Sequence, residues 1–167
     1  MEITFRTATH KDLTALKNLA VKSWSQFQRS LTNDNWVKLN NNLTSDKTYE
    51  ELIDKSVGFV ATSDHDNIVG MAFLVPNGNP TDIYDESWCY IRFVTVAPDF
   101  NGHGIGRKLT NLCIQTARQN NEKVIALHTS EFMDSARHIY ESMGFTILKE
   151  IDQRLGKRYW LYKLDLG

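Results

Sequence analysis

The sequence predicts one α/β domain with a central mixed β-sheet of about seven strands flanked by about four helices. A start rich in strand patterns is followed by the order strand, helix, strand, helix, strand. The chain has 167 residues, of which 41% are hydrophobic, and this suffices for one substantial core but not for two ordinary domains. We therefore expect a single domain over residues 1–167.

The first third of the chain predicts one strand followed by helices. Residues 2–8 alternate apolar and polar side chains, as a strand does. Residues 9–12, Thr-His-Lys-Asp, resemble a capping box, and the apolar residues of 13–27 recur at helical spacing. The polar stretch 30–48 contains scattered apolar residues and predicts a short helix with irregular flanks. A second capping-box pattern predicts a brief helix over 48–55.

The middle of the chain predicts a hairpin and a further strand. Residues 57–62 and 68–75 are apolar runs separated by a polar turn, which is typical of a β-hairpin. Residues 76–80, Pro-Asn-Gly-Asn-Pro, break regular structure. Residues 86–96 are rich in β-branched and aromatic side chains, and Pro98 ends this strand because it lacks a backbone donor.

A glycine loop follows that strand. Gly102, Gly104 and Gly106 stand at alternate positions, where they let the backbone take positive φ and approach a ligand closely. Apolar residues then recur at helical spacing, so the loop leads into a helix that continues to about Asn120. Loop amides and a helix N-terminus together favour binding of a phosphate group.

A glycine loop can also be a dinucleotide site, a P-loop or a tight turn without a ligand. A dinucleotide site has the spacing G-x-G-x-x-G, and a P-loop has a Lys-Ser/Thr pair after its second glycine. Neither pattern is present here. A tight turn without any ligand remains an alternative for the glycines taken alone.

The last part of the chain continues the alternation of strands and helices. Residues 124–128 predict a strand, and residues 134–142 predict a helix for which Gly144 is a good C-terminal stop. Residues 145–150 and 159–164 predict two closing strands. The sequence shows no repeat, low-complexity tract or linker.

Two motifs resemble the GNAT superfamily of N-acetyltransferases. The loop Asn101-Gly-His-Gly104-Ile-Gly106, after a Val-x-Pro turn, resembles the family's acyl-CoA loop Arg/Gln-x-x-Gly-x-Gly/Ala. Asn101 stands where relatives have Arg or Gln, but the family holds the pyrophosphate mainly with backbone amides. The stretch Ala136-Arg-His-Ile-Tyr140-Glu-Ser-Met-Gly144-Phe145 resembles the family pattern Ala-x-x-x-Tyr-x-x-x-Gly-Phe. The order of elements also resembles the GNAT fold over essentially the whole chain.

The resemblance implies acetyl-CoA as co-substrate. In the family it enters a gap between two splayed strands, which here would be those ending at Val96 and His128. Met133 occupies a place where relatives often have an Asn that contacts the cofactor. The residues implied to bind acetyl-CoA are Val94, Thr95, Val96, Asn101, Gly102, His103, Gly104, Ile105, Gly106, Arg107, Met133, Ser135 and Tyr140.

The resemblance also implies direct transfer of the acetyl group in a ternary complex. Tyr140 would be the acid that protonates the departing thiolate, whereas packing against the sheet is the structural alternative. Tyr90 stands where many relatives carry a Glu that serves as base. Glu86 is the candidate replacement, and Asp85 and His128 are alternatives, although carboxylates at a strand start are more often solvated than catalytic.

Arg92 is a charged residue within an apolar strand. An unpaired charge there is costly, so we expect a carboxylate partner or a place along the cleft, and of these a structural ion pair is the first expectation. The five histidines show no metal-ligand spacing, so we expect no metal.

The expected partner is a small-molecule or peptide amine. Aromatic and acidic side chains before and around the central strand predict an acceptor pocket suited to a cationic amine. An aromatic surface of this kind is equally consistent with a homodimer contact. The residues concerned are Trp24, Phe27, Trp36, Asp82, Tyr84 and Asp85.

Charge, hydropathy and cysteine content argue against a general nucleic-acid-binding protein, a membrane-spanning protein and a disulfide-rich protein. The formal net charge of −1 argues against a general nucleic-acid or anionic-membrane surface. No apolar run approaches membrane-spanning length, and the first residues do not resemble a signal peptide. Cys89 and Cys113 are interpreted as small core residues, which fits the reducing cytoplasm.

These patterns predict an acetyl-CoA-dependent N-acetyltransferase. A non-catalytic acyl-CoA-binding or regulatory module on the same fold is the alternative, because the strand Glu is missing. A nucleotide-binding domain is a weaker third interpretation, because the glycine spacing does not fit one.

Overall fold

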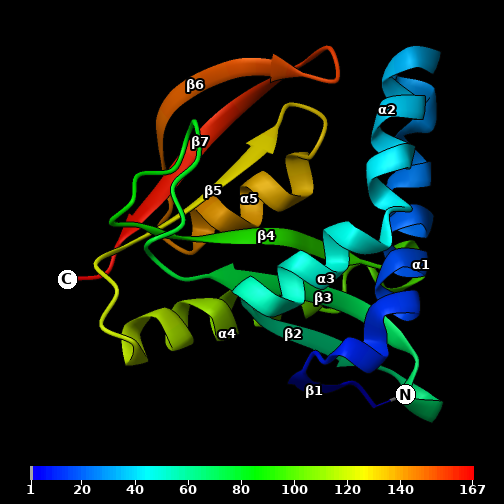
Figure 1. Ribbon diagram of the computed structural model, residues 1–167, viewed down its shortest axis with the longest axis horizontal. Coiled ribbons are helices and arrows are strands. Elements are labelled where there is room, and N and C mark those ends of the chain that lie inside the picture. Colours follow the sequence, from blue (N-terminus) through cyan, green and yellow to red (C-terminus); the bar gives the residue numbers. More distant parts are fainter. Residues whose placement is uncertain (1) are drawn as a thin grey trace.

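The computed structural model describes residues 2–167 and contains the predicted seven-stranded mixed sheet (Figure 1). The strand order is β1-β2-β3-β4-β5-β7-β6, in which β4 and β5 are parallel and all other neighbours are antiparallel. The strands are β1 (Thr4–Thr7), β2 (Val57–Thr62), β3 (Ile68–Val75), β4 (Cys89–Val96), β5 (Val124–Ser130), β6 (Thr146–Arg154) and β7 (Lys157–Asp165).

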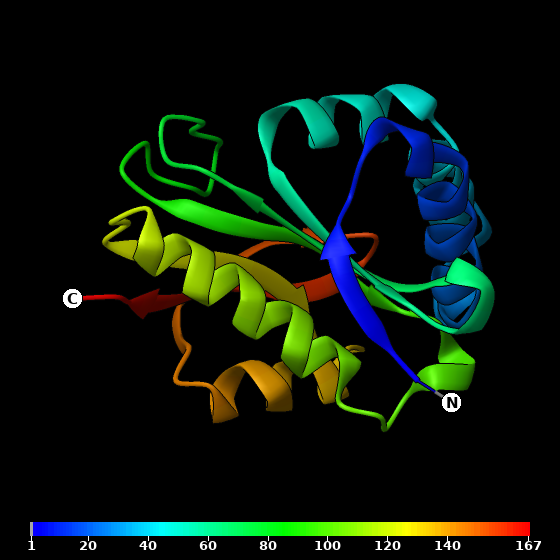
Figure 2. The same ribbon diagram turned by 90° about the horizontal axis from the view of Figure 1, so that it is seen from below.

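Five α-helices cover the two faces of the sheet. Figure 2 shows α4 and α5 on one side and α1, α2 and α3 on the other. Each layer buries apolar side chains against the strands, for example Leu16 of α1 and Leu109 of α4, neither of which is exposed. The helices are α1 (Leu13–Trp24), α2 (Asn33–Leu43), α3 (Asp46–Lys55), α4 (Ile105–Gln119) and α5 (Asp134–Ser142).

The helical layer before β2 differs in detail from the prediction. The polar stretch folds as α2, which Thr32 caps by accepting a hydrogen bond at Oγ1 from Asn35 N at 3.1 Å. The expected capping box at Thr48 and Glu51 is wrong, because α3 begins earlier and both residues lie inside it. Helix α1 ends at Trp24, and a 3-10 segment continues to Ser30.

The last two strands form a longer hairpin than predicted. Strand β6 continues to Arg154 and β7 begins at Lys157. Leu155 and Gly156 make the turn between them with φ of 55° and 73°, the left-handed conformation typical of a two-residue hairpin loop. The hairpin tip reaches α2, since a Cβ placed on Gly156 would lie 3.2 Å from Nδ2 of Asn35.

Both cysteines are buried and free, as the sequence indicated. Burial raises the pKa of each thiol to about 12, so both stay protonated at neutral pH. In residues 2–167 we find no helix long and apolar enough to span a membrane.

The predicted capping box at Thr9 and Asp12 is present and also anchors β1. Asp12 accepts a hydrogen bond from Thr9 N at 2.8 Å, and its two oxygens accept bonds of 2.9 Å from Nη1 and Nη2 of Arg6. The Arg6 guanidinium holds the pKa of Asp12 below its usual range. One carboxylate thus joins the first strand to the start of the helical layer.

We predict that Asp12→Asn lowers the free energy of unfolding by about 1 to 2 kcal/mol, because it weakens a cap and a partly exposed ion pair. Since the folded pKa of Asp12 is depressed, this stability is present above about pH 4 and is lost as pH falls through the folded value. Urea unfolding across pH measures it. Asp66→Asn is the control, because Asp66 lies 3.5 Å from Arg6 but is 69% exposed. Equal losses in both variants would contradict the assignment.

Candidate functional site

Strands β4 and β5 separate soon after they begin. Cys89 pairs with Ile125 and Tyr90 with Ala126, and these are the two register pairs that join the strands within residues 2–167. Beyond them the edge of β4 that faces β5 has no strand partner. Its backbone groups are therefore available to a ligand that enters the gap.

A β-bulge shapes β4 where the gap opens. Phe73 pairs with Arg92 and Met71 pairs with Thr95, so two residues of β4 lie opposite one residue of β3. The first bulged residue, Phe93, has a φ of 57°, which is unusual for a side chain other than glycine. The hydroxyl of Thr95 donates a 3.1 Å hydrogen bond to the carbonyl of Phe93 and stabilises this conformation.

The glycine loop joins β4 to α4. Gly102 and Gly104 have φ of 83° and 75°, and a Cβ on either would meet no atom of the protein within 4 Å. The loop backbone therefore borders open space, and Gly104 immediately precedes the first residue of α4. Gly106 differs from the prediction, because it lies inside α4 without a positive φ, and a Cβ placed on it would lie 3.7 Å from Cγ2 of Val96.

A cleft of about 890 Å³ lies along the glycine loop, the end of β4, the end of α1 and one face of α5. This volume lies within the range of small-molecule sites. The lining residues are Ser23, Trp24, Gln26, Phe27, Val94, Thr95, Val96, Phe100, Asn101, Gly102, Gly104, Ile105, Gly106, Arg107, Thr110, Phe132, Met133, Asp134, Ser135, Ala136, His138, Ile139 and Tyr140.

The cleft brings together most of the residues expected to bind acetyl-CoA. Those that line it are Val94, Thr95, Val96, Asn101, Gly102, Gly104, Ile105, Gly106, Arg107, Met133, Ser135 and Tyr140. His103 is exposed and does not line the cleft. Glu86 is also exposed and lies in the loop before β4, at the opposite end of that strand from the glycine loop.

Tyr140 reaches the cleft from α5. Its side chain is 6% exposed and packs edge-on against Phe145, with ring centroids 6.0 Å apart. Tyr140 lines the cleft, and its hydroxyl has no hydrogen-bond partner among residues 2–167. Burial raises the pKa of Tyr140 above its ordinary value, so the phenol stays protonated and can donate to a ligand.

His128 and Tyr84 form a pair on the other side of the sheet. The register places Tyr162 opposite Leu127, and Tyr162 donates to Glu141 of α5, so α5 covers the Leu127 face and His128 points away from it. Nδ1 of His128 lies 2.6 Å from the Tyr84 hydroxyl. Burial, with Arg154 and Arg92 nearby, lowers the pKa of His128 to about 4.

Tyr90 stands at the position where a base was expected. Its ring stacks on that of Tyr84 with centroids 4.1 Å apart, and its hydroxyl donates to the carbonyl of Asn79 at 3.0 Å. Burial raises the pKa of Tyr90. The side chain therefore holds the loop before β4 in place and remains a neutral donor.

Arg92 does not have the ion pair that the sequence predicted. Among residues 2–167, no carboxylate lies within 4.0 Å of its guanidinium, and the group instead lies 5.3 Å from the centroid of the Phe93 ring. Arg92 stands two residues after Tyr90 on β4, so its side chain lies on the same side of the sheet as Tyr90, Tyr84 and His128.

An aromatic cluster forms one wall of the cleft. Phe27 and Phe132 meet edge-on with centroids 5.1 Å apart, and Trp24 lies 6.0 Å from Phe132. The sequence singled out Trp24 and Phe27, but Phe132 was missed. No local pattern distinguishes Phe132, because its partners are about a hundred residues earlier in the chain.

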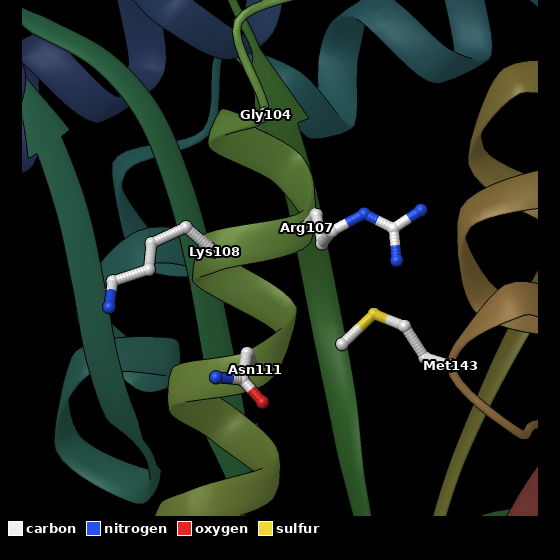
Figure 3. A pocket seen from close by; sticks show the side chains of 5 residues that line it. All are labelled: Gly104, Arg107, Lys108, Asn111 and Met143. Atoms are coloured by element: carbon white, nitrogen blue, oxygen red, sulfur yellow. The ribbon is translucent and has the colours of Figure 1, made fainter.

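A smaller hollow of about 360 Å³ adjoins the cleft and shares Gly104 and Arg107 with it. Figure 3 shows Arg107 extending from α4 toward Met143, which reaches back from the end of α5, while Lys108 points to the other side of the helix. Arg107 donates to the hydroxyl of Ser142 at 2.9 Å. Both cations lie in the first turn of α4, beside the glycine loop.

Metal binding has no visible basis in this site. Within residues 2–167, no three His, Cys, Asp or Glu side chains converge as ligands of a metal ion would.

Comparisons with known structures show the same fold. PaiA N-acetyltransferase from Thermoplasma acidophilum, in complex with coenzyme A, is 15% identical with a TM-score of 0.79, over 99% of each chain. The ribosomal-protein-S18-alanine N-acetyltransferase from Escherichia coli is 16% identical with a TM-score of 0.72, over 99% of this chain and 95% of that one. YncA, a putative acetyltransferase from Salmonella typhimurium with acetyl-CoA, is 20% identical with a TM-score of 0.70, over 100% and 95%.

The sequence comparisons identify the family. A search of curated proteins found no similar sequence. The family model described as "Acetyltransferase (GNAT) family" matches residues 15–145, which is well over half of the 167 residues and includes both motifs that carried the resemblance. This chain therefore belongs to the GNAT family of acetyltransferases.

Proposed function

We propose that this protein transfers the acetyl group of acetyl-CoA to a primary amine by direct attack in a ternary complex. The observation that carries the proposal is one cleft lined by the glycine loop, the unpaired end of β4 and Tyr140. Three structures with the same fold are named as complexes with coenzyme A or acetyl-CoA. The acceptor is a small molecule or a peptide.

The glycine loop would hold the pyrophosphate of acetyl-CoA. Gly102 and Gly104 leave their amides open to a ligand, and the N-terminus of α4 adds the positive end of a helix dipole. Arg107, which lines the cleft, adds a positive charge near the phosphates. The pantetheine arm would then pair with the free edge of β4 at Val94 to Val96.

The reaction requires a bond exchange at the thioester carbon. The neutral amine attacks the carbonyl carbon, the C–N bond forms, and the C–S bond breaks with its electron pair on sulfur. The amine nitrogen loses a proton and the sulfur gains one, so the products are an amide and free coenzyme A. Backbone NH groups at the β4 bulge are placed to bind the carbonyl oxygen as it becomes negative.

Tyr140 is the proposed donor to the departing sulfur. Tyr140 lines the cleft, and its hydroxyl has no protein partner among residues 2–167. A phenol with a raised pKa is a weak acid, but it remains protonated over the whole working range of pH. The same burial would raise the pKa of the coenzyme A thiol, so its thiolate would be basic enough to accept the proton of the phenol.

The proton of the acceptor leaves by another route. Loss of a proton from an ammonium of pKa about 10.4 to water at pH 7 costs about 4 to 5 kcal/mol. Transfer to His128, whose pKa is about 4, would cost roughly 9 kcal/mol, so His128 is not a useful base. Glu86 lies outside the cleft. We therefore propose that the amine binds in its neutral form, having lost its proton to water.

The alternative function is an acyl-CoA-binding module without turnover, and the tyrosine in place of the strand carboxylate is the observation behind it. Release of free thiol, with mass spectrometry of the acetylated product, decides between the two across a panel of amines, amino acids and peptides. Binding of coenzyme A without thiol release on any acceptor would support the module.

We also propose that the protein is located in the cytoplasm. Its two free cysteines agree with a reducing compartment of this kind.

We predict that Gly104→Val lowers the affinity for acetyl-CoA at least tenfold, because a β-branched residue resists a φ of 75° and its side chain would enter the space of the pyrophosphate. Calorimetric titration measures the affinity. Gly78→Val is the matched control, since Gly78 also has a positive φ of 89° with open space around it but lies outside the cleft. Equal affinity in both folded variants would remove the phosphate-loop assignment.

We predict that Tyr140→Phe keeps the fold and the affinity for acetyl-CoA but slows single-turnover transfer at least tenfold, because a positioned acid contributes about 10² to 10⁴ fold. Because burial raises the pKa of Tyr140, wild type should show no loss of rate through this group until pH exceeds its ordinary value of about 10. Tyr49→Phe is the control, since Tyr49 is fully buried and lies outside the cleft. Wild-type rates for Tyr140→Phe would leave Tyr140 a packing residue.

We predict that kcat/KM rises with pH up to the solution pKa of the amine that is used, because the enzyme takes the neutral amine and does not deprotonate the ammonium itself. Two acceptors of different pKa measure this, and the midpoint of the rising limb should move with the amine. A limb that stays at one pH for both amines would instead reveal a base on the enzyme.

A further inference from the structure

We propose that the acceptor is an amine that also carries a carboxylate, and that Arg92 binds this carboxylate. The inference rests on the proposed transferase function and names the class of acceptor. It replaces the cationic amine that the acidic and aromatic residues of the sequence had suggested.

Arg92 lies beside the place where β4 and β5 part. The last register pair of the two strands, Tyr90 with Ala126, shares one face of the sheet. Because side chains alternate along a strand, Arg92 and His128 lie two residues further on the same face, across the opening of the gap. Helix α5 with Tyr140 covers the opposite face, so this is the side from which a second substrate can approach the thioester.

The charge of Arg92 is not neutralised by the protein. Its guanidinium is half-buried and contacts the ring of Phe93 at 5.3 Å, and it has no carboxylate within 4.0 Å among residues 2–167. Arg154 is a second cation on this face. Its partner Asp82 lies 3.7 Å away and is 81% exposed, so solvent screens that pair strongly.

The neighbours of Arg92 on this face do not carry a negative charge that could balance it. Burial, and to a smaller extent the charges of Arg154 and Arg92, lowers the pKa of His128 to about 4, so its ring is neutral at pH 7. Burial raises the pKa of Tyr84, so its phenol is also neutral. Among residues 2–167, the carboxylate recorded on this face is the exposed Asp82, which pairs with Arg154.

A partly buried cation without a counterion is costly, and it is retained where a ligand supplies the opposite charge. A guanidinium binds a carboxylate through two parallel hydrogen bonds, which also orients the ligand. An ammonium placed beside the same cations would be repelled. The charges thus favour an acceptor that is anionic at one end and a neutral amine at the other.

The test compares acceptors that differ only at the end remote from the amine. We expect kcat/KM to be 10- to 100-fold higher for an ω-amino carboxylate than for the amino alcohol of equal length, which corresponds to a charge-assisted hydrogen bond. A diamine of that length should be the poorest acceptor. Several chain lengths and an aminoalkyl phosphate complete the series, and a phosphate preferred over every carboxylate would overturn the choice of carboxylate.

Variants then assign the preference to Arg92. Arg92→Gln should raise KM for the amino carboxylate at least tenfold and leave KM for acetyl-CoA and for the amino alcohol unchanged, and Arg92→Lys should restore part of the loss. Arg118→Gln is the control, because Arg118 donates to the carbonyl of Leu166 at the far end of α4. An equal loss with charged and neutral acceptors would overturn the proposal.

The outcomes separate this inference from the proposed function. Transfer to neutral amines or diamines in preference to amino carboxylates would refute the carboxylate and leave the transferase intact. No transfer to any amine would refute the transferase. In that case, calorimetric titration of the coenzyme A complex with the amino carboxylate still tests the site, and binding that Arg92→Gln does not weaken would overturn it.

Discussion

The structure depends on the separation of β4 from β5. Two parallel strands normally share hydrogen bonds along their length, but here the pairing stops at Tyr90 and Ala126. The bulge at Phe93 re-aims the end of β4, and Thr95 holds the bulge with its hydroxyl. The cleft forms around the resulting gap, because the gap supplies a free strand edge in the middle of an otherwise continuous sheet.

The two faces of the sheet give this gap different chemistry. Helices α4 and α5 cover one face, where the glycine loop and Tyr140 line the same cleft. The opposite face carries Arg92 and Arg154 beside a histidine that stays neutral. Anionic cofactor groups and an anionic acceptor would therefore meet positive surroundings on both sides, while the reacting centre itself holds neutral donors.

Neutral donors also limit how the reaction can work. A histidine with a pKa of about 4 cannot take a proton from an alkyl ammonium at a useful rate, and the expected carboxylate is exposed in the loop before β4. The proposed route avoids this difficulty, because an amine that enters already neutral needs no residue of the cleft to accept its proton.

The sequence by itself determined what is local. Alternation of side chains, the glycine spacing and the Tyr140 motif predicted seven strands, a glycine loop before a helix and the family, because each depends on neighbouring residues. Tertiary structure alone decided the rest. Phe132 joins Trp24, Arg92 remains without a carboxylate, and Glu86 lies away from the cleft, because these facts depend on how distant segments pack and where strands part. A pattern within a segment cannot encode the distance between two segments.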